Sequence, residues 1–196
     1  PILLHDAILD RTTNGSGSPN DYTLTRIEGL NASYWQGTHH SGARLSQPAY
    51  PICQIPTFEQ VLKALSSRIG MNIQVKENDS RFLQRVCTLY AQYNLYPTSY
   101  LTVDNFDVAN TVRSLDANIA LCVLQERTNV TRHSAYGCVA CQPRREEVTA
   151  EVCQQANQAG MPLNMFWVDD GQELPHWINM GLSGVLTNAS DVIINA

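Results

Sequence analysis

The sequence predicts an α/β protein built from parallel β/α units. Short apolar runs alternate with amphipathic segments along residues 57–196, which is the order of strand and helix expected of such units. The apolar runs lack a clean polar alternation, as is typical of parallel strands that are buried on both faces. A doubly wound sheet and a closed barrel both satisfy this pattern.

Six short apolar runs are predicted to be strands. A barrel normally contains eight strands in about 250 residues, so six units in 196 residues would be a barrel that lacks two units. The periodicity alone does not choose between the two architectures. The predicted strands span residues 71–75, 100–103, 119–124, 136–139, 163–168 and 184–187.

Five helices are predicted from apolar residues spaced three and four apart. Thr57 and Gln60 form a capping-box pattern at the start of the first, and Gly160 is placed to end the fourth. No convincing helical pattern occurs in residues 125–135. The apolar stripes are Phe58, Val61, Leu62 and Leu65; Phe82, Val86 and Leu89; Val108, Val112 and Leu115; Val148, Val152 and Ala156; and Leu174, Trp177 and Ile178.

Composition excludes several classes of protein. Apolar residues make up 43% and charged residues 16% of the chain, and the net charge is −5. These values are ordinary for a globular protein and, without a basic run, argue against nucleic-acid binding. No membrane span and no signal-peptide pattern is found. The chain starts at Pro1 without an initiator Met, so we expect it to be cut from a longer protein, soluble and either cytoplasmic or secreted; its oligomeric state is left open.

The six cysteines are predicted to be free thiols, most of them in the core. Cys138 and Cys141 have the spacing of metal ligands, but no second pair or His completes four ligands. A core position is therefore favoured over a metal or redox role. The polar loop pair His39 and His40 is interpreted as solvated.

Residues 5–17, HDAILDRTTNGSG, carry the most informative motif. They resemble the glycerophosphodiester phosphodiesterase family, in which an apolar strand runs into a His-Asp pair and then a Leu-x-Arg-Thr-Thr-x-Gly turn. The resemblance covers essentially the whole chain and implies a (β/α)8 TIM-type barrel, with the first two β/α units missing and strands three to eight present. Further matching segments are 55–62, 72–76, 105–107, 166–168 and 184–188.

The resemblance also implies the domain organisation. We expect a single barrel domain over residues 1–196, in which 1–56 hold the active-site motif and an inserted loop region. Residues 14–20 in this part form a dense turn cluster. Residues 57–196 hold the β/α repeats.

Phosphodiester cleavage must stabilise negative charge, deprotonate a nucleophile and protonate the leaving alkoxide. A hard divalent cation serves the first need and paired imidazoles the other two. The family resemblance implies two histidines and one calcium or magnesium ion on three acidic side chains. His5 matches the second histidine and is the predicted general acid or base; the alternative is a histidine hydrogen-bonded in a turn.

The other site residues follow from the same resemblance. Lys76 is predicted to offer its ammonium group to the substrate phosphate, and Phe106 and Trp167 to line the pocket, unless they are barrel-core aromatics. Gln74 stands where the family has a Glu metal ligand. It either still ligates the metal or orients a metal-bound water, or the metal site is lost. Asn188 replaces a usual Asp without an evident reason.

The family's first histidine and its Glu-x-Asp carboxylates have no counterpart in this sequence. We therefore expect the chain alone to be inactive or nearly so, while the full-length parent hydrolyses small glycerophosphodiesters to an alcohol and glycerol phosphate. The alternatives are a catalytically dead relative that binds a phosphorylated ligand or serves a structural role, and an incomplete fragment. The catalytic hypothesis requires His5 and Lys76 to converge on one phosphate-sized hollow.

Overall fold

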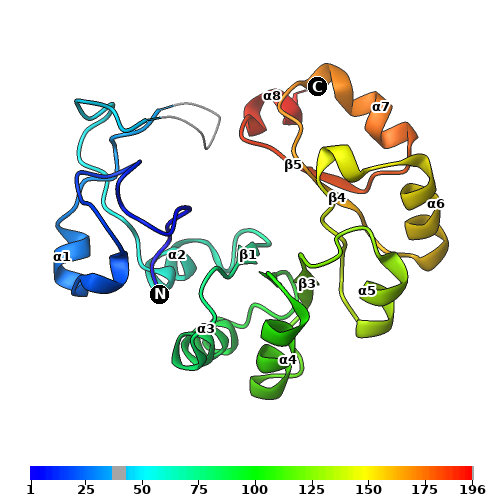
Figure 1. Ribbon diagram of the computed structural model, residues 1–196, viewed down its shortest axis with the longest axis horizontal. Helices are drawn as coiled ribbons and strands as arrows, with labels where there is room; N and C mark the ends of the chain where they lie inside the picture. Colours follow the sequence, from blue (N-terminus) through cyan, green and yellow to red (C-terminus); the bar gives the residue numbers. More distant parts are fainter. Residues whose placement is uncertain (37–42, 196) are drawn as a thin grey trace. The chain divides into compact units, whose positions relative to one another are not determined.

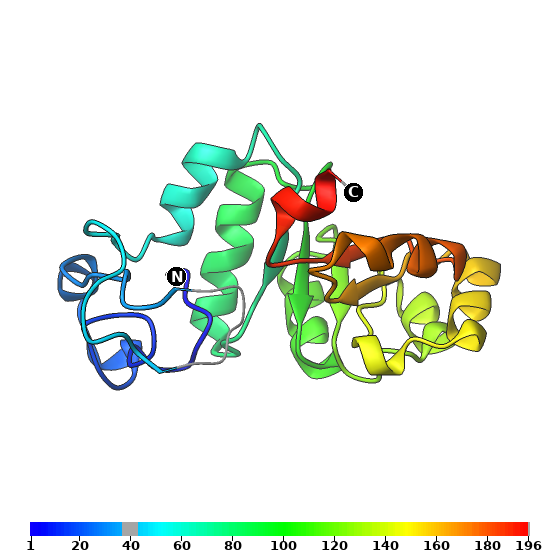
Figure 2. The same ribbon diagram turned by 90° about the horizontal axis from the view of Figure 1, so that it is seen from above.

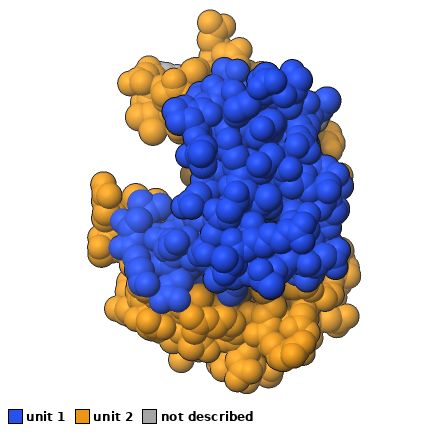
Figure 3. Space-filling view, turned by 90° about the vertical axis from the view of Figure 1, so that its left-hand side faces the viewer, with its two compact units in different colours: residues 1–65 blue, residues 66–196 orange. Residues whose placement is uncertain are grey.

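The structure is a computed structural model that describes residues 1–36 and 43–195 (Figure 1). The chain divides into two compact units, Pro1–Leu65 and Ser66–Ala196, which Figure 3 colours blue and orange. The N-terminal unit therefore extends past residue 56 and includes the first predicted helix. That all 196 residues form one domain stays a prediction.

The N-terminal unit consists mostly of turns and loops. Its helical elements are η1 (Pro19–Asp21), α1 (Leu24–Glu28) and α2 (Phe58–Leu65). The predicted capping box of α2 is confirmed: the Thr57 amide donates to Gln60 Oε1 at 2.8 Å, and the Gln60 amide donates to Thr57 Oγ1 at 3.1 Å. An isolated antiparallel bridge joins Ile2 to Thr57 and ties the start of this unit to α2.

A small apolar cluster supports this unit. Leu9, Ile27 and Ile55 are buried in it. The turn that follows Leu9 is held by polar groups instead: the fully buried Thr13 donates its hydroxyl to the Leu9 carbonyl at 2.7 Å and accepts from the Gly15 amide at 2.9 Å. A Cβ at Gly15 would lie 2.9 Å from Leu30 Cδ1, so glycine lets the turn close on the cluster.

The C-terminal unit contains five parallel strands in two sheets. The first sheet has the order β1 (Asn72–Gln74), β2 (Tyr100–Val103) and β3 (Leu121–Val123), and the second pairs β4 (Asn164–Phe166) with β5 (Gly184–Leu186). All pairings are parallel. Five of the six predicted strands are therefore confirmed, together with their direction.

The strand predicted at residues 136–139 is wrong, and so is the absence of a helix before it. Helix α5 (Val130–Tyr136) occupies this place, with Asn129 as its N-cap and Gly137, at φ +80°, as its left-handed end. Tyr136 belongs to the buried side of α5 rather than to a strand, and a four-residue apolar run does not distinguish the two structures.

Residues 138–144, the linking segment, take the missing strand's position. The Val139 amide donates to the Leu121 carbonyl at 2.9 Å, and the Phe166 amide donates to the Pro143 carbonyl at 3.0 Å. Isolated parallel bridges pair Cys141 with Leu163 and Arg144 with Phe166. The linking segment thus connects the two sheets, but Pro143 has no amide proton for a regular ladder.

Helices cover the outer side of these strands (Figures 1 and 2). The predicted stop at Gly160 is confirmed, because this residue ends α6 at φ +61°, and Asp79 caps the start of α3 by accepting from the Arg81 and Phe82 amides. No helix in the described part of the chain is long and apolar enough to cross a membrane. The elements are α3 (Ser80–Gln92), α4 (Phe106–Leu115), η2 (Arg145–Glu147), α6 (Ala150–Ala159), η3 (Gly171–Glu173), α7 (Leu174–Asn179) and α8 (Ser190–Ile194).

Strand β3 and, apart from the half-buried Tyr100, strand β2 are buried on both faces, as predicted, and one of the two faces of β2 is polar. On β2, Leu101 and Val103 are fully buried and share one face. The other face carries Thr102, whose hydroxyl donates to Asn72 Oδ1 of β1 at 2.6 Å. Asn164 of β4 donates to the Tyr100 hydroxyl at 3.3 Å. The inner face is therefore lined with hydrogen-bonding groups that lead to the strand ends.

Candidate active site

In the N-terminal unit, His5 is hydrogen-bonded to Asp6, which in turn is bound by Arg11. His5 is exposed on 58% of its side-chain surface, and its Nδ1 lies 2.6 Å from Asp6 Oδ1. Arg11 holds the same carboxylate in a fork, with Nε 2.6 Å from Oδ2 and Nη2 3.0 Å from Oδ1. The Arg11 guanidinium lies over the Trp35 ring at 5.1 Å. The motif thus builds a histidine oriented by a fixed carboxylate.

Asp6 is ionised over the whole physiological range. The hydrogen bond from Arg11, opposed by burial and reinforced by His5, lowers the pKa of the Asp6 carboxyl to about 2. An anion beside Nδ1 selects the tautomer with a proton on Nδ1 and leaves Nε2 facing outward. This is the electrostatic setting that a histidine needs to act as an acid or a base.

The rest of the motif forms the turn behind this pair. Asp10 Oδ2 accepts from the Gly17 amide at 2.7 Å, and the Gly17 carbonyl accepts from the Leu9 amide at 2.9 Å. Gly17 has φ +77°, a left-handed conformation in which glycine is unstrained. The Thr and Gly positions of the motif are therefore explained by the turn rather than by chemistry.

In the C-terminal unit, a small hollow opens at the carboxyl ends of β1 and β2. Its lining includes Lys76, Glu77, Asn78 and Asp104. Lys76 is exposed and lies two residues beyond the end of β1. Gln74 is also exposed and is the last residue of β1, opposite Thr102. Both residues thus lie at the carboxyl end of β1.

Three charged residues at strand ends escaped sequence analysis. Asp104 follows β2, Arg127 follows β3, and Arg144 ends the linking segment. Arg127 donates from Nη1 to the Gln142 carbonyl at 3.1 Å, and its guanidinium lies 5.2 Å from the centre of the Phe166 ring. For Asp104 the available indication was a charged residue directly after an apolar run, because parallel strands bring such residues to one edge; Arg127 and Arg144 lie three and five residues beyond their runs and had no such signal.

The two predicted pocket aromatics lie in different surroundings. Phe106 is buried at the start of α4 and makes edge contacts with His133 and Tyr136 of α5 at 5.6 and 5.0 Å. Trp167 is half-buried and follows β4. Guanidinium groups lie over the Phe106 ring (Arg132, 4.1 Å) and over the ring of Phe166, the neighbour of Trp167 (Arg127, 5.2 Å). Substrate contacts of Phe106 and Trp167 stay a prediction.

Asn188 has a structural explanation. Its backbone amide and its side-chain Nδ2 donate to the Asp169 carboxylate at 2.7 and 3.1 Å. Thr187 donates its hydroxyl to the same carboxylate at 2.9 Å. Aspartate at position 188 would replace a donor with a second negative charge, so the amide fits this partner.

Comparison with known proteins identifies the family. The sequence profile of the glycerophosphoryl diester phosphodiesterase family matches residues 1–192. The chain belongs to the glycerophosphoryl diester phosphodiesterase family. This membership supports a phosphoric diester hydrolase by resemblance.

Relatives of this family match nearly the whole chain. A glycerophosphodiester phosphodiesterase of Caldanaerobacter subterraneus subsp. tengcongensis is 23% identical, over 99% of this chain and 79% of the relative. One of Bacillus subtilis (strain 168) is also 23% identical, over 97% of this chain and 70% of the relative.

Solved structures of the family show the fold. An Oleispira antarctica phosphodiesterase, solved with the product sn-glycerol-3-phosphate, has a TM-score of 0.80 at 18% identity and covers 100% of this chain and 78% of its own. The fold is therefore α/β and TIM-barrel-like. That two β/α units precede the strands of this chain stays a prediction.

The donor set of this family member does not fit a resident divalent cation. Among residues 1–36 and 43–195, no group of three or more His, Cys, Asp or Glu side chains is placed to hold a metal. Gln74 offers one neutral amide oxygen where calcium or magnesium prefers several oxygens with carboxylates among them. The described residues alone therefore do not provide a site for such an ion.

The cysteines and the remaining histidines supply no further centre. Five thiols are buried and Cys53 is exposed, all of them free as predicted. Burial raises the pKa of Cys122 and of Cys141 to about 12, so neither is a thiolate at neutral pH. His133 is buried and contacts the Gln125 carbonyl through Nε2 at 2.9 Å. His39 and His40 lie outside the described residues.

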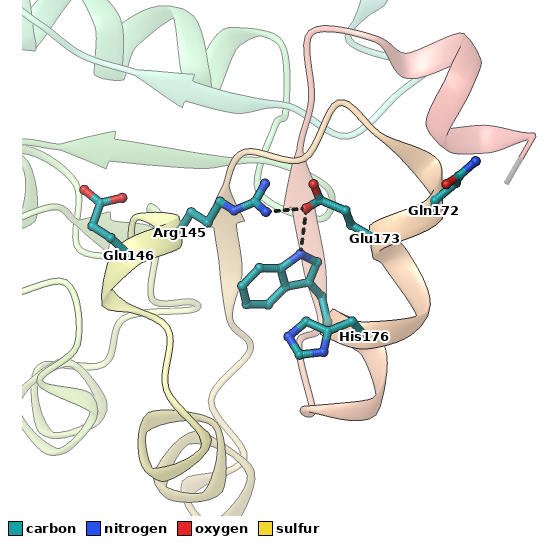
Figure 4. A pocket seen from close by; sticks show the side chains of 6 residues that line it. Arg145, Glu146, Gln172, Glu173 and His176 are labelled. Carbon is teal, nitrogen blue, oxygen red and sulfur yellow. Dashed lines mark hydrogen bonds and ion pairs between the residues drawn. The ribbon is translucent and has the colours of Figure 1, made fainter.

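A second hollow lies between η2, η3 and α7 (Figure 4). Two of its charges are paired with each other: Arg145 Nη2 lies 2.7 Å from Glu173 Oε2, which also accepts from Trp177 Nε1 at 3.3 Å. The Arg145 guanidinium covers the Trp177 ring at 5.4 Å. This arrangement of satisfied groups fastens η2 to α7.

Proposed function

We propose that the full-length protein hydrolyses glycerophosphodiesters to an alcohol and glycerol phosphate. The observation that carries this proposal is the ordered His5, Asp6 and Arg11 array inside the family motif. A solved relative holds sn-glycerol-3-phosphate as its product, which is the product class expected here. The proposed substrates are small molecules, without nucleic acid as a partner.

His5 is the proposed general acid or base. Asp6 holds Nδ1, so Nε2 is the ring atom that exchanges a proton with the substrate. The neutral ring removes a proton from the nucleophile. The imidazolium that results can then protonate the leaving alkoxide. The Asp6 carboxylate, with its pKa of about 2, stabilises the imidazolium that forms between these steps.

Lys76 is the proposed phosphate-binding residue. An ammonium at the carboxyl end of a strand stabilises negative charge on phosphoryl oxygens. A divalent cation, calcium or magnesium, completes this proposal for the full-length protein, where its chemistry would be to neutralise the same oxygens. Because the family's first histidine and its Glu-x-Asp carboxylates have no counterpart in these 196 residues, and Gln74 is uncharged, we propose that these residues alone are inactive or nearly so.

A second candidate function is favoured by Gln74 itself. An amide in place of a metal-binding carboxylate suits a relative that binds a phosphorylated ligand without cleaving it. Lys76 would then keep its role while His5 would have none. The two functions differ in a single measurable consequence, which is release of the alcohol.

The test is hydrolysis by the full-length protein. Release of ethanolamine from sn-glycero-3-phosphoethanolamine is measured with calcium, with magnesium and with a chelator, for the wild type, His5→Ala and Lys76→Ala. We expect His5→Ala to lower kcat by about 10²- to 10⁴-fold and Lys76→Ala to raise KM. Lys63→Ala, a lysine paired with Glu59 on α2, is the control. Binding of glycerol phosphate without any release would establish the second function instead.

A further inference from the structure

We propose that Arg127 determines the preference for the alcohol part of the substrate by binding an anionic group on it. This inference rests on the proposed function, which it deepens. Arg127 follows β3 at the carboxyl ends of the strands, where the hollow beside Lys76 also lies. No counterpart of Arg127 is needed for the acid, the base or the phosphate.

The Arg127 side chain is fixed in place but only partly used. Its guanidinium stacks on Phe166 of β4, 5.2 Å from the ring centre, and donates once, from Nη1 to the Gln142 carbonyl. A guanidinium has five N–H donors. The remaining donors have no protein acceptor among the described residues, so a planar, rigid fork is available.

The charge of Arg127 is poorly compensated. No carboxylate lies within ion-pair distance of it in the part of the chain that the structure describes. Burial, and next the positive charge of Arg144, lower the pKa of Arg127, while smaller influences of Glu147, Cys122 and Asp104 raise it. The two largest influences oppose the cation, so an arriving anion would be stabilised there.

A neighbouring buried group also lacks an acceptor. Gln142 is fully buried, and its Nε2 has no hydrogen-bond partner among the described residues. Its Oε1 lies 3.4 Å from the Thr102 hydroxyl on the polar inner face. A buried donor without a partner requires one, such as a water or ligand oxygen. The residue that positions Arg127 therefore has unused donor capacity as well.

Arg127 is separate from the proposed phosphate site. It does not line the hollow that contains Lys76, whose lining residues come from the segments after β1 and β2 and from the start of α4. Its guanidinium is held instead against Phe166 of β4 and the Gln142 carbonyl. We therefore assign Arg127 to a different part of the substrate from the phosphate.

A carboxylate on the alcohol fits this cation best, because a guanidinium binds it through two parallel hydrogen bonds. Glycerophosphoserine and glycerophosphoethanolamine make a matched pair, since they differ by one carboxylate and share the ammonium. We expect the wild type to favour the serine diester. Arg127→Gln should lower kcat/KM for that substrate by about 10- to 100-fold and leave the ethanolamine diester unchanged.

The experiment compares both substrates in the full-length protein for the wild type, Arg127→Gln, Arg127→Lys and Arg132→Gln. Arg132 is the matched control, an arginine over Phe106 that already pairs with Glu126. Arg127→Lys keeps the charge without the fork, so an intermediate preference is expected if Arg127→Gln does not fold. An equal loss for both substrates in folded Arg127 variants, or no loss for either, overturns the proposal.

A different readout separates this inference from the proposed function. If the wild type cleaves neither diester, the hydrolase proposal fails. Calorimetric binding of O-phosphoserine and O-phosphoethanolamine then decides the role of Arg127. Tighter binding of phosphoserine that Arg127→Gln abolishes would support the anion site, and equal binding of the two compounds would refute it.

Discussion

The two units of the molecule are specified in different ways. The N-terminal unit holds its motif with turns, caps and ion pairs around three buried apolar residues. The C-terminal unit repeats strand and helix around a larger apolar core, in which Leu101, Leu121 and Val103 are fully buried. The candidate acid/base group, His5, is therefore held by polar local structure. Lys76 and Arg127, which are proposed to bind substrate, follow strands that pack in an apolar core.

Truncating a buried leucine should destabilise the C-terminal unit more than the N-terminal unit. Leu121→Ala removes a fully buried side chain from β3 and should lower the free energy of unfolding by about 3–5 kcal/mol. Leu9→Ala, in the smaller cluster, should cost about 2 kcal/mol because that site can relax. Urea unfolding measures both, and an equal or greater cost for Leu9→Ala would break the comparison.

Replacing a closely packed glycine with alanine should also destabilise the C-terminal unit. A Cβ at Gly70 would lie 2.6 Å from the Thr98 carbonyl oxygen, whereas one at Gly29 would lie 3.5 Å from the Arg26 carbonyl oxygen. Gly70→Ala must move backbone in the scaffold and should destabilise it by about 1–3 kcal/mol. Gly29→Ala should stay within about 0.5 kcal/mol. Thermal unfolding of the two variants provides the measurement, and similar melting temperatures would contradict this expectation.

A polar substitution tests the N-terminal unit. Thr13→Val keeps the shape of the side chain but leaves the Gly15 amide without its acceptor, at a cost of about 1–3 kcal/mol. Thr25→Val, at an exposed position of α1, is the control. Hydrogen exchange should increase around residues 9–17 in Thr13→Val alone. Unchanged protection there would mean that apolar contacts, not the turn, hold the motif.

The smallest effect is the pH dependence of the Asp6 array. Because the folded-state pKa of Asp6, about 2, lies below its usual unfolded value of about 3.9, its stabilisation is complete above pH 4 and is lost as the pH falls toward 2. Asp6 is partly exposed, so we expect about 1–2 kcal/mol after screening. In Asp6→Asn, the free energy of unfolding should therefore fall less steeply between pH 4 and pH 2 than in the wild type. An unchanged pH dependence in the variant would rule out this contribution.

Periodic features were the easiest to predict from sequence. The capping box at Thr57 and the stop at Gly160 were correct because caps use local chemistry. The strand predicted at 136–139 was wrong because a short apolar run does not show whether its residues belong to one element. Tyr136 ends α5, Gly137 caps it, and Cys138 begins the linking segment. A single N-cap, Asn129, was too weak an indication of α5.

The candidate site was predicted only where a motif names its residues. His5 and Asp6 are adjacent, but the Arg11 fork on Asp6 depends on the folding of the turn. Arg127 has no motif at all, and its contacts with Gln142 and Phe166 join residues 15 or more positions away. Such groups become visible only once the strand order is known.

The linking segment couples the packing between the two sheets to the position of Arg127. It bonds to β3 through the Val139 amide and pairs with Leu163 and Phe166 through two isolated bridges, and Cys141, Gln142 and Pro143 are buried. The Gln142 carbonyl of the same segment accepts from Arg127. A substitution that moves Arg127 through this stretch would therefore also disturb the contacts that join the sheets.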